Sequence, residues 1–405
     1  MNDSLYILTS FDFSKASGAA WSRVNNYAEC LQPHNTNVYI TSPAYDLSKE
    51  YSISQTGNSI FQIRSAFTEK YHKSYIQQFR FSHYYKHYIS LYKISVKQDA
   101  NKKVFFLYSF NLASVVMALL VFRILKRQKI YCEKNELQLG IALNQPLPRN
   151  VINYFPALLL KTVTVIAGFM QDAMTVHFNG IITISRRFLK LYSKTNKKII
   201  LIPILANQMF FRCGREINQG NDYKICYTGD INQNKDGILD LLNALSLIRS
   251  RQITCDLYGN VNIEFRSQLA GKLETMGDFH SVKIHTQKPH EKIAEILSGY
   301  DLLILPRPRN LQTIFGFSTK LAEYLASSVP VLASRISDND LYIEDGKNGF
   351  LYEPGDIVQL GSKIEKIASL GQDRLHTVGC SGRITAQEHF TISKYSFLLK
   401  SFFFN

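Results

Sequence analysis

The segment from Pro306 to Pro330 contains the residues whose types and spacing best suit the binding of a charged ligand. A short apolar run precedes a polar loop that contains Gly316, and a helical pattern opens at Ser318 and Thr319. Backbone N–H groups in the first turn of a helix have no intrahelical partner, and the helix dipole favours negative charge there. The pattern therefore predicts an anion site at the start of this helix.

Glu323 follows Ser318 by five positions, so we expect its carboxylate about one turn deeper on the same helix. An anion site followed by a carboxylate suits a ligand that carries both phosphate and hydroxyl groups. The alternative is an ordinary strand-loop-helix unit without a ligand, and the spacing alone does not separate the two.

The length and composition of the chain limit the number of domains and the kind of partner. A chain of 405 residues is too long for one typical domain and predicts two or three. The net charge of +15 indicates an anionic partner, which is a nucleic acid, an acidic membrane surface or a phosphorylated substrate. The six cysteines are scattered without a CxxC pair, which argues against a zinc or disulfide framework and is typical of a reducing cytosol. We also expect no cleavable signal.

Strand and helix patterns alternate in both halves of the chain. Leu5 to Ser10 and Asn37 to Thr41 are expected strands on either side of a helix at Trp21 to Leu31, which makes one βαβ unit and implies a parallel sheet. The irregular segment Ala206 to Asp222 is the expected linker, and the rhythm restarts at Lys224. A cleft between two such α/β domains is the default ligand site. No G-x-G-x-x-G motif is present, so a dinucleotide site is not indicated.

The stretch from Glu69 to Lys97 interleaves basic residues with tyrosine and phenylalanine, and Glu69 is its only acid. Cations beside amphipathic rings suit a membrane headgroup layer. Single-stranded nucleic acid would use the same chemistry. The third interpretation is a solvated helix whose aromatic side chains enter the core. It is weighed almost equally with the membrane interpretation, and both are favoured over nucleic-acid binding.

Two apolar stretches, 104–125 and 151–170, approach the roughly 20 residues that cross a bilayer, but polar residues interrupt both. We interpret them as buried helices of a large α/β domain. A monotopic membrane contact is the alternative.

Several segments, taken in their order and spacing, resemble the nucleotide-sugar glycosyltransferases of the GT-B fold, of the family 4 type. In the second half these are Y-T-G-D-I-N-Q-N-K-D-G-I-L-D-L-L-N-A-L from Tyr227, L-Y-G-N from Leu257, H-E-K-I-A-E-I-L-S-G-Y-D-L-L-I-L-P-R from His290, G-F-S-T-K-L-A-E-Y-L-A-S-S-V-P-V-L-A-S from Gly316 and I-E-D-G-K-N-G-F-L-Y-E-P-G-D from Ile343. In the first half, G-I-I-T-I-S-R-R-F from Gly180 and I-L-I-P-I from Ile200 are similar to segments before the family's linker.

The resemblance implies an α/β protein of GT-B fold, with two Rossmann-like domains facing a cleft and a C-terminal helical tail. The implied boundaries are 1–205 for an acceptor domain, 206–370 for a donor domain and 371–405 for the tail. The implied activity is retaining hexosyl transfer without a metal. No cofactor is implied. The donor substrate is a nucleoside-diphosphate sugar, with a UDP-sugar favoured.

The resemblance also carries ligand roles to individual positions. Glu323 would hold the ribose hydroxyls and Lys235 the diphosphate, while the Gly18–Ala19 loop would approach the donor from the first domain. Phosphate and sugar would be held by a run of backbone groups, those of Gly316, Phe317, Ser318, Thr319 and Lys320.

Three positions depart from the family pattern. Phe315 stands where the family has the first carboxylate of a pair, Asp230 stands where a basic residue is common, and Lys235 precedes Gly237 by two positions instead of one. Arg307, just after a strand, could replace the lost cation or pair with a local carboxylate, and the two roles are weighed equally.

The acceptor side has fewer signals. Glu133, or Glu136, follows a strand at the expected cleft and is the candidate carboxylate that orients the acceptor hydroxyl. A helix-capping or salt-bridge role is the favoured alternative for either residue. In the family the departing phosphate can itself take the acceptor proton, and no His or Asp here demands the role of a base.

Together these observations predict a cytoplasmic enzyme bound peripherally to the inner face of the membrane. It would transfer a sugar to a lipid-linked glycan in surface polysaccharide synthesis, such as that of capsule or lipopolysaccharide. A catalytically weak GT-B protein that acts as a binding or scaffold subunit is the alternative. Nucleic acid is not an expected partner, because no recognised motif accompanies the charge.

Overall fold

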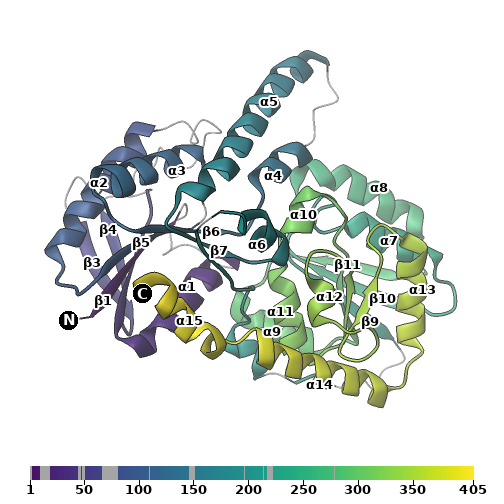
Figure 1. Cartoon of the computed structure of the whole chain (residues 1–405). Helices are drawn as coiled ribbons and strands as arrows, with labels where there is room; N and C mark the ends of the chain where they lie inside the picture. The colour runs from purple at the N-terminus through teal and green to yellow at the C-terminus, as the bar shows by residue number, and fades with distance from the viewer. Residues whose placement is uncertain are drawn as a thin grey trace. The chain divides into compact units, whose positions relative to one another are not determined.

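The computed structural model describes residues 2–9, 19–43, 47, 51–65, 81–108, 110–145, 151–195, 197–212, 214–216, 222–277 and 279–405, with the backbone alone at 19 and 151–154. The chain forms two compact units (Figure 1). Unit 1 comprises Met1–Ile202 and Ile392–Asn405, and unit 2 comprises Pro203–Thr391.

Unit 1 is built on a sheet whose described strands follow the order β3-β4-β2-β1-β5-β6-β7-β8. Neighbouring strands are parallel except for the antiparallel pair β3 and β4. The strands are β1 Asp3–Thr9, β2 Thr36–Thr41, β3 Tyr51–Gly57, β4 Ile60–Ser65, β5 Lys103–Tyr108, β6 Ile130–Lys134, β7 Gly180–Thr183 and β8 Lys198–Leu201. Continuous apolar runs such as the one in β1 are buried, as a sheet covered on both faces requires.

Helices cover this sheet. They are α1 Ala19–Leu31, α2 Phe81–Lys97, α3 Leu112–Ala118, the π-helical segment η4 Leu119–Leu125, α4 Gln138–Asn144, α5 Val151–Met174, α6 Arg186–Tyr192 and α15 Ile392–Phe404, with short 3₁₀ turns η1 Gln32–His34 and η5 Thr175–His177. The last helix, α15, packs on the sheet through Phe402 and Phe403, whose rings lie 5.0 and 5.4 Å from that of Tyr131.

Unit 2 has a parallel sheet in the order β11-β10-β9-β12-β13-β14. Its strands are β9 Tyr223–Thr228, β10 Ile253–Tyr258, β11 Ser281–His285, β12 Leu302–Leu305, β13 Val331–Ser334 and β14 Phe350–Tyr352. Its helices are α7 Ile238–Leu247, α8 Arg266–Met276, α9 His290–Ser298, α10 Leu311–Phe315, α11 Thr319–Ala326, α12 Asn339–Tyr342, α13 Ile357–Ala368 and α14 Gln372–His389, with 3₁₀ turns η6 Gln208–Phe211 and η7 Ile263–Phe265.

The helical tail expected at 371–405 is divided between the units. Its first helix, α14, belongs to unit 2, and its second, α15, belongs to unit 1. The reason is packing, because α14 lies against α11 while the aromatic side chains of α15 fill the core of unit 1. The change of unit after Ile202 falls three residues before the boundary expected at 205.

The order of the strands locates the site in unit 2. Numbered from β9 as the first, they run 3-2-1-4-5-6 across the sheet, so the order reverses between β9 and β12. Connections leave these two strands toward opposite faces, which opens a crevice at their carboxyl ends, and open α/β sheets bind ligands there.

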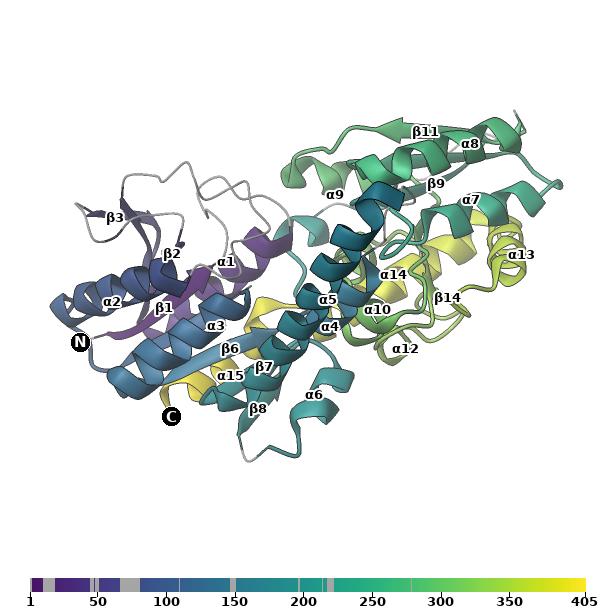
Figure 2. The same ribbon diagram turned by 90° about the horizontal axis from the view of Figure 1, so that it is seen from above.

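The two apolar stretches differ in how much of their surface is buried. Residues 104–122 form β5, α3 and most of η4 and are largely buried, as expected. The expectation that 151–170 is buried is wrong for its described side chains, 155–170, because much of α5 extends away from the sheet of unit 1 (Figures 1 and 2). Only 17% of its most apolar window is buried, and the helix is long and apolar enough to cross a membrane.

The basic aromatic stretch 69–97 is described only from residue 81. There α2 buries Tyr84, Tyr88 and Leu91 and exposes Lys86 and Lys93. The Tyr88 and Ser114 hydroxyls lie 2.5 Å apart in the core. Two of the five Phe and Tyr side chains in α2 therefore serve packing in the core, while its basic residues Lys86 and Lys93 are exposed. A membrane role for this stretch stays a prediction.

Candidate functional site

The loops after β9 and β10 meet at the carboxyl edge of the unit 2 sheet. The Gly229 N–H donates to the carbonyl of Tyr258 over 2.8 Å. Gly259 has a φ of 157°, and a Cβ at this position would lie 1.7 Å from the Gly229 carbonyl oxygen. Only glycine permits this close approach, which shapes the floor of the crevice.

The loop after β12 contacts the loop after β9. Arg307, which is only 4% exposed, donates through Nε to the Lys235 carbonyl over 3.4 Å. Gly237 has a φ of 65°, and a Cβ there would lie 1.9 Å from the carbonyl oxygen of Pro306. Two predicted cations, Lys235 and Arg307, are thus on adjoining loops at the point where the strand order reverses.

Lys320 places a third cation at this site. Its ammonium group lies 3.0 Å from Asp236 Oδ1 and 5.0 Å from the centre of the Tyr227 ring. Burial opposes ionisation of Asp236, but Lys320 and Arg307 outweigh it and hold the pKa of this carboxyl below its usual range. The two basic side chains of Lys320 and Arg307 therefore act on one buried carboxylate, which leaves positive charge for an anionic ligand.

Asp236 is a site residue that the sequence reasoning missed. Its signal was present, because Asp236 is the extra residue that separates Lys235 from Gly237 by two positions. Asn232 holds the carboxylate in place, since Asn232 Nδ2 donates to Asp236 Oδ2 over 2.8 Å.

The start of α11 has the geometry expected of an anion site. Ser318 is the extended residue before the helix, and its side chain makes no capping hydrogen bond. The Leu321 N–H donates to the Ser318 carbonyl over 3.3 Å. Thr319 and Lys320 fill the first two helical positions, so their N–H groups have no intrahelical acceptor.

Gly316 and Phe317 precede this helix with different roles. The Gly316 N–H donates to Gln312 and closes α10. The Phe317 ring lies 5.5 Å from Tyr342 and 5.8 Å from Phe390, in a buried aromatic cluster. Only the backbone of Phe317 is therefore available to a ligand, as the sequence analysis assigned it.

Glu323 lies one turn further along α11, where it pairs with His290 of α9. Glu323 Oε1 and His290 Nε2 are 2.9 Å apart, and both side chains are nearly buried. Burial disfavours the charged imidazole, but Glu323 raises the pKa of His290 above its ordinary value. In the described part of the chain, Glu323 Oε2 accepts no hydrogen bond, so one carboxylate oxygen is left for a ligand hydroxyl.

His290 is a second site residue that sequence reasoning missed, although the segment H-E-K-I begins with it. The Phe210 ring packs edge-on against it at 5.4 Å. Tyr324 anchors the same helix from its other side, because its hydroxyl accepts the Thr228 N–H over 2.8 Å at the end of β9. These contacts hold Glu323 beside the crevice.

Two of the three departures from the family pattern, Phe315 and Asp230, lie close to this site in the chain. Phe315 is the last residue of α10, a short helix with a capping box between Asn310 and Thr313. Asp230 accepts the Tyr227 hydroxyl through its carbonyl over 2.9 Å. Neither position has a group that replaces the missing carboxylate or cation.

Glu133 of unit 1 is an ion-pair residue in the structure. Its carboxylate lies 3.3 Å from Arg23 Nε and also accepts the Tyr27 hydroxyl, and Glu133 is only 1% exposed. Burial raises the pKa of Glu133, although Arg23 and Tyr27 work against that shift. The ion pair with Arg23 agrees with the salt-bridge alternative, and a role of Glu133 toward the acceptor hydroxyl stays a prediction.

The remaining unit 1 residues expected at the donor cannot be placed at a site. Gly18 lies outside the described residues, and Ala19 is the first residue of α1. Glu136 is partly exposed beyond the end of β6. No group of three His, Cys, Asp or Glu side chains suited to a metal ion occurs among the described residues.

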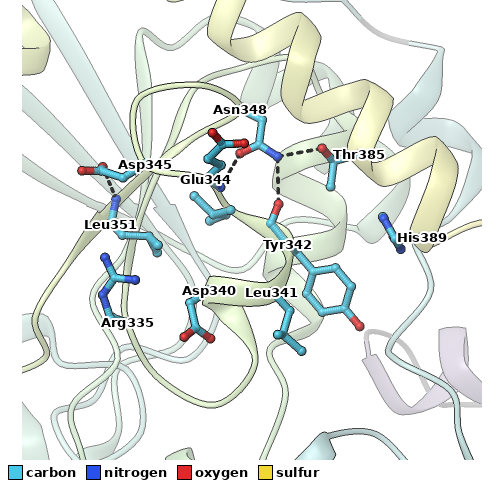
Figure 3. Close-up of a pocket in the computed structure, with 11 residues that line it drawn as sticks. Arg335, Asp340, Leu341, Tyr342, Glu344, Asp345, Asn348, Leu351, Thr385 and His389 are labelled. Carbon is cyan, nitrogen blue, oxygen red and sulfur yellow. Dashed lines mark hydrogen bonds between the residues drawn. The ribbon is translucent and has the colours of Figure 1, made fainter.

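An open pocket of about 420 Å³ lies elsewhere in unit 2, around α12 and the start of β14 (Figure 3). Asp340, Glu344 and Asp345 line it, and Asp345 is engaged by the Leu351 N–H at 2.9 Å and by Lys363 at 2.6 Å. Three carboxylates disfavour a diphosphate. None of the predicted site residues lines this pocket, so we place the candidate site at β9, β12 and α11.

Comparisons with known proteins agree with this geometry. Residues 222–369 match the family model described as glycosyl transferases group 1. No curated protein matches the chain. Among solved structures, sucrose-phosphate synthase from Thermosynechococcus elongatus matches with a TM-score of 0.73 at 16% identity, over 99% of this chain and 98% of that one.

Two further structures match over 98% or more of each chain. A glycosyltransferase from Rickettsia africae has a TM-score of 0.66 at 15% identity, with 99% of this chain and 98% of that one covered. Anabaena HepE in complex with UDP-glucose has a TM-score of 0.65 at 13% identity, with 98% of both chains covered. The resemblance drawn from the sequence is thereby confirmed: residues 222–369 match the glycosyl transferases group 1 model, and the whole chain has the fold of the GT-B glycosyltransferases.

Proposed function

We propose that this protein transfers a hexose from a nucleoside diphosphate to a glycan acceptor, with retention of the anomeric configuration and without a metal ion. The observation that carries the proposal is the grouping of Lys235, Arg307 and Lys320 with the start of α11 and with Glu323. Cations and free N–H groups suit a diphosphate, and the second oxygen of a held carboxylate suits ribose hydroxyls.

In this proposal the basic groups act on the leaving diphosphate. The bond between the anomeric carbon and the β-phosphate oxygen breaks, and the acceptor hydroxyl oxygen forms the new bond to that carbon. The proton of the hydroxyl passes to the departing phosphate oxygen. Lys235, Arg307, Lys320 and the amide groups of α11 stabilise the charge that develops on the diphosphate.

We favour a UDP-sugar as the donor. HepE is described in complex with UDP-glucose, and an E. coli protein described under the name trehalose-6-phosphate is bound with UDP-2-fluoro glucose. Both have the same fold as this chain, at TM-scores of 0.65 and 0.67. The proposal extends this donor chemistry to the site around Glu323.

We further propose a lipid-linked glycan as the acceptor and a peripheral position on the cytoplasmic face of the membrane, in the synthesis of a surface polysaccharide. The net charge of +15 and the exposed basic face of α2 support an anionic surface as partner. Sedimentation with anionic vesicles at low salt tests this part, and a protein that stays in the supernatant would refute it.

A thermal-shift screen with UDP-, GDP- and ADP-linked sugars, each with and without EDTA, tests the donor. One nucleotide series should raise Tm in a concentration-dependent manner and should do so equally in EDTA. Glu323→Ala and Lys235→Ala should each reduce this shift, while Glu295→Ala on the exposed side of α9 serves as the control. Equal shifts of Tm in the wild type and in all three variants would refute the placement of the donor site at Glu323 and Lys235.

The second candidate is a GT-B protein that binds nucleotide but transfers sugar weakly and acts as a scaffold subunit. Phe315 and Asp230 favour it, because each replaces an expected polar or basic side chain, and Asp236 further offsets the charge of Lys320. Donor hydrolysis measured with the nucleotide sugar that raises Tm separates the two. Binding without turnover would support the scaffold.

A further inference from the structure

Helix α5 exposes an apolar surface that the sugar-transfer proposal does not use. Phe155, Leu159, Ile166 and Phe169 are 71%, 69%, 55% and 61% exposed. The mean hydropathy of the helix window is 1.3, and 17% of that window is buried. A surface helix of a globular domain normally buries its apolar stripe. An exposed apolar surface of this size therefore indicates a partner.

The polar side chains on this part of α5 are already satisfied. The Lys161 ammonium donates to the Gln145 carbonyl over 2.7 Å. The Thr162 and Thr164 hydroxyls donate back to the carbonyls four residues earlier, over 2.9 and 2.8 Å. The two hydroxyl donors therefore need no water, which is the condition that an acyl-chain environment imposes on a helix, and the long Lys161 stem allows its ammonium to stay at the polar surface.

The helices α4 and α5 form a hairpin that leaves and rejoins one sheet. They pack closely where a Cβ at Gly168 would lie 3.0 Å from the backbone of Gln138. Asp172 fastens the base of the hairpin by accepting the N–H groups of Gln138 and Leu139 over 3.2 and 3.0 Å. Because the chain enters from β6 and returns to its neighbour β7, both ends of the hairpin lie on the same side of any bilayer.

The charge around the base of the hairpin is basic. The sequence has no acidic residue between Glu136 and Asp172. Helix α6 lies beside this base, because the Tyr192 hydroxyl donates to the Asp172 carbonyl over 3.3 Å. Its exposed charged residues, Arg186, Arg187 and Lys190, are all cations. An apolar projection beside exposed cations matches an acyl layer beneath anionic headgroups.

We propose that the α4–α5 hairpin inserts its apolar part into one leaflet of an anionic bilayer, with α6 at the headgroups. From Phe155 to Met170 the helix is about 24 Å long at about 1.5 Å per residue. Half of a bilayer core is about 15 Å thick, so the helix enters one leaflet at a tilt and does not cross. This anchoring is separate from sugar transfer and from any electrostatic contact of 69–97.

Vesicle flotation of the full chain tests the anchoring, with vesicles that contain phosphatidylglycerol and at 0.1 and 1 M NaCl. Wild-type protein should float at both salt concentrations, since salt screens charge but not apolar insertion. The double variant Leu159→Glu and Phe169→Glu should lose binding by roughly 50-fold or more at 1 M NaCl, because each carboxylate would enter the acyl layer. Phe397→Glu, which alters a side chain that is 76% exposed on α15, is the matched control and should float like wild type.

Two further readouts distinguish failure of the proposal from failure of the fold. All variants should keep the wild-type Tm, because the altered side chains are exposed. A Leu159→Trp variant should lose fluorescence with brominated acyl chains, whereas Phe397→Trp should not. Unchanged flotation of the double variant would overturn the proposal. A second result would also overturn it: the wild-type protein is a dimer without lipid, the double variant is a monomer, and neither binds vesicles. The exposed face of α5 would then contact a second copy of the chain.

Discussion

The role of Glu323 can be tested by removing its carboxylate and the ligand hydroxyls in the same experiment. The perturbations are Glu323→Ala in the protein and replacement of UDP by 2′,3′-dideoxy-UDP as the ligand. If Oε2 of Glu323 accepts a ribose hydroxyl, each change alone should weaken binding, and the two together should cost little more than one.

The size of the effect follows from the environment of the carboxylate. The Glu323 side chain is 12% exposed, and Oε1 is held by His290 at 2.9 Å, so the carboxylate is ordered before a ligand arrives. A hydrogen bond to a charged group contributes about 1.5–3 kcal/mol. Glu323→Ala should therefore weaken UDP binding by roughly 10- to 150-fold.

Isothermal titration calorimetry at fixed salt gives the four dissociation constants of this cycle. Glu295→Ala should bind both nucleotides like wild type, since its side chain is exposed on α9. Glu323→Ala should bind dideoxy-UDP within about threefold of wild type. Equal losses for UDP and dideoxy-UDP would refute the ribose assignment and leave Glu323 with a structural role beside His290.

Three other predictions concern stability. The pKa of His290 is raised in the folded protein, so its contribution to the free energy of unfolding is present below about pH 6.5 and is lost as pH rises through the folded pKa. Urea unfolding should thus show that His290→Asn lowers the free energy of unfolding more at pH 6 than at pH 9. An equal loss at both pH values would contradict the ion pair. Gly379→Ala would place a Cβ 1.9 Å from the Ser328 carbonyl and should cost about 1–3 kcal/mol by thermal denaturation, whereas Gly271→Ala, with nothing within 4 Å, should be neutral or stabilising. Glu133→Gln leaves a buried guanidinium without its counter-charge and should cost about 3–5 kcal/mol; a loss of transfer at unchanged Tm would instead support the catalytic role.

The residues that the sequence reasoning placed well belong to short, strongly patterned segments. Leu302–Leu305 is an apolar run that forms β12, and α11 begins at Thr319 as the Ser318 pattern predicts. Local sequence suffices here, because a buried strand and a helix start both depend on neighbouring residues. The β3–β4 hairpin was not predicted, and its polar, largely exposed β3 has a weak hydrophobic signal.

Partners that are distant in the chain were beyond such reasoning. Asp236 and Lys320 meet because the loop after β9 and helix α11 share one edge of the sheet, and His290 reaches Glu323 from a different helix. Glu133 likewise pairs with Arg23, which lies on α1 and is distant in the chain. Spacing along the chain does not contain these distances.

The sequence by itself determined that the chain is an α/β protein and that the second half resembles a glycosyltransferase domain, and it predicted an anion site at the start of α11 with Glu323 behind it. These features depend on periodicity and on motifs within one or two elements. Only the tertiary structure decided whether an apolar helix is covered or exposed. The sequence of α5 is compatible with either, because burial depends on what the rest of unit 1 places against it, and unit 1 leaves large apolar side chains such as Phe155, Leu159 and Phe169 exposed.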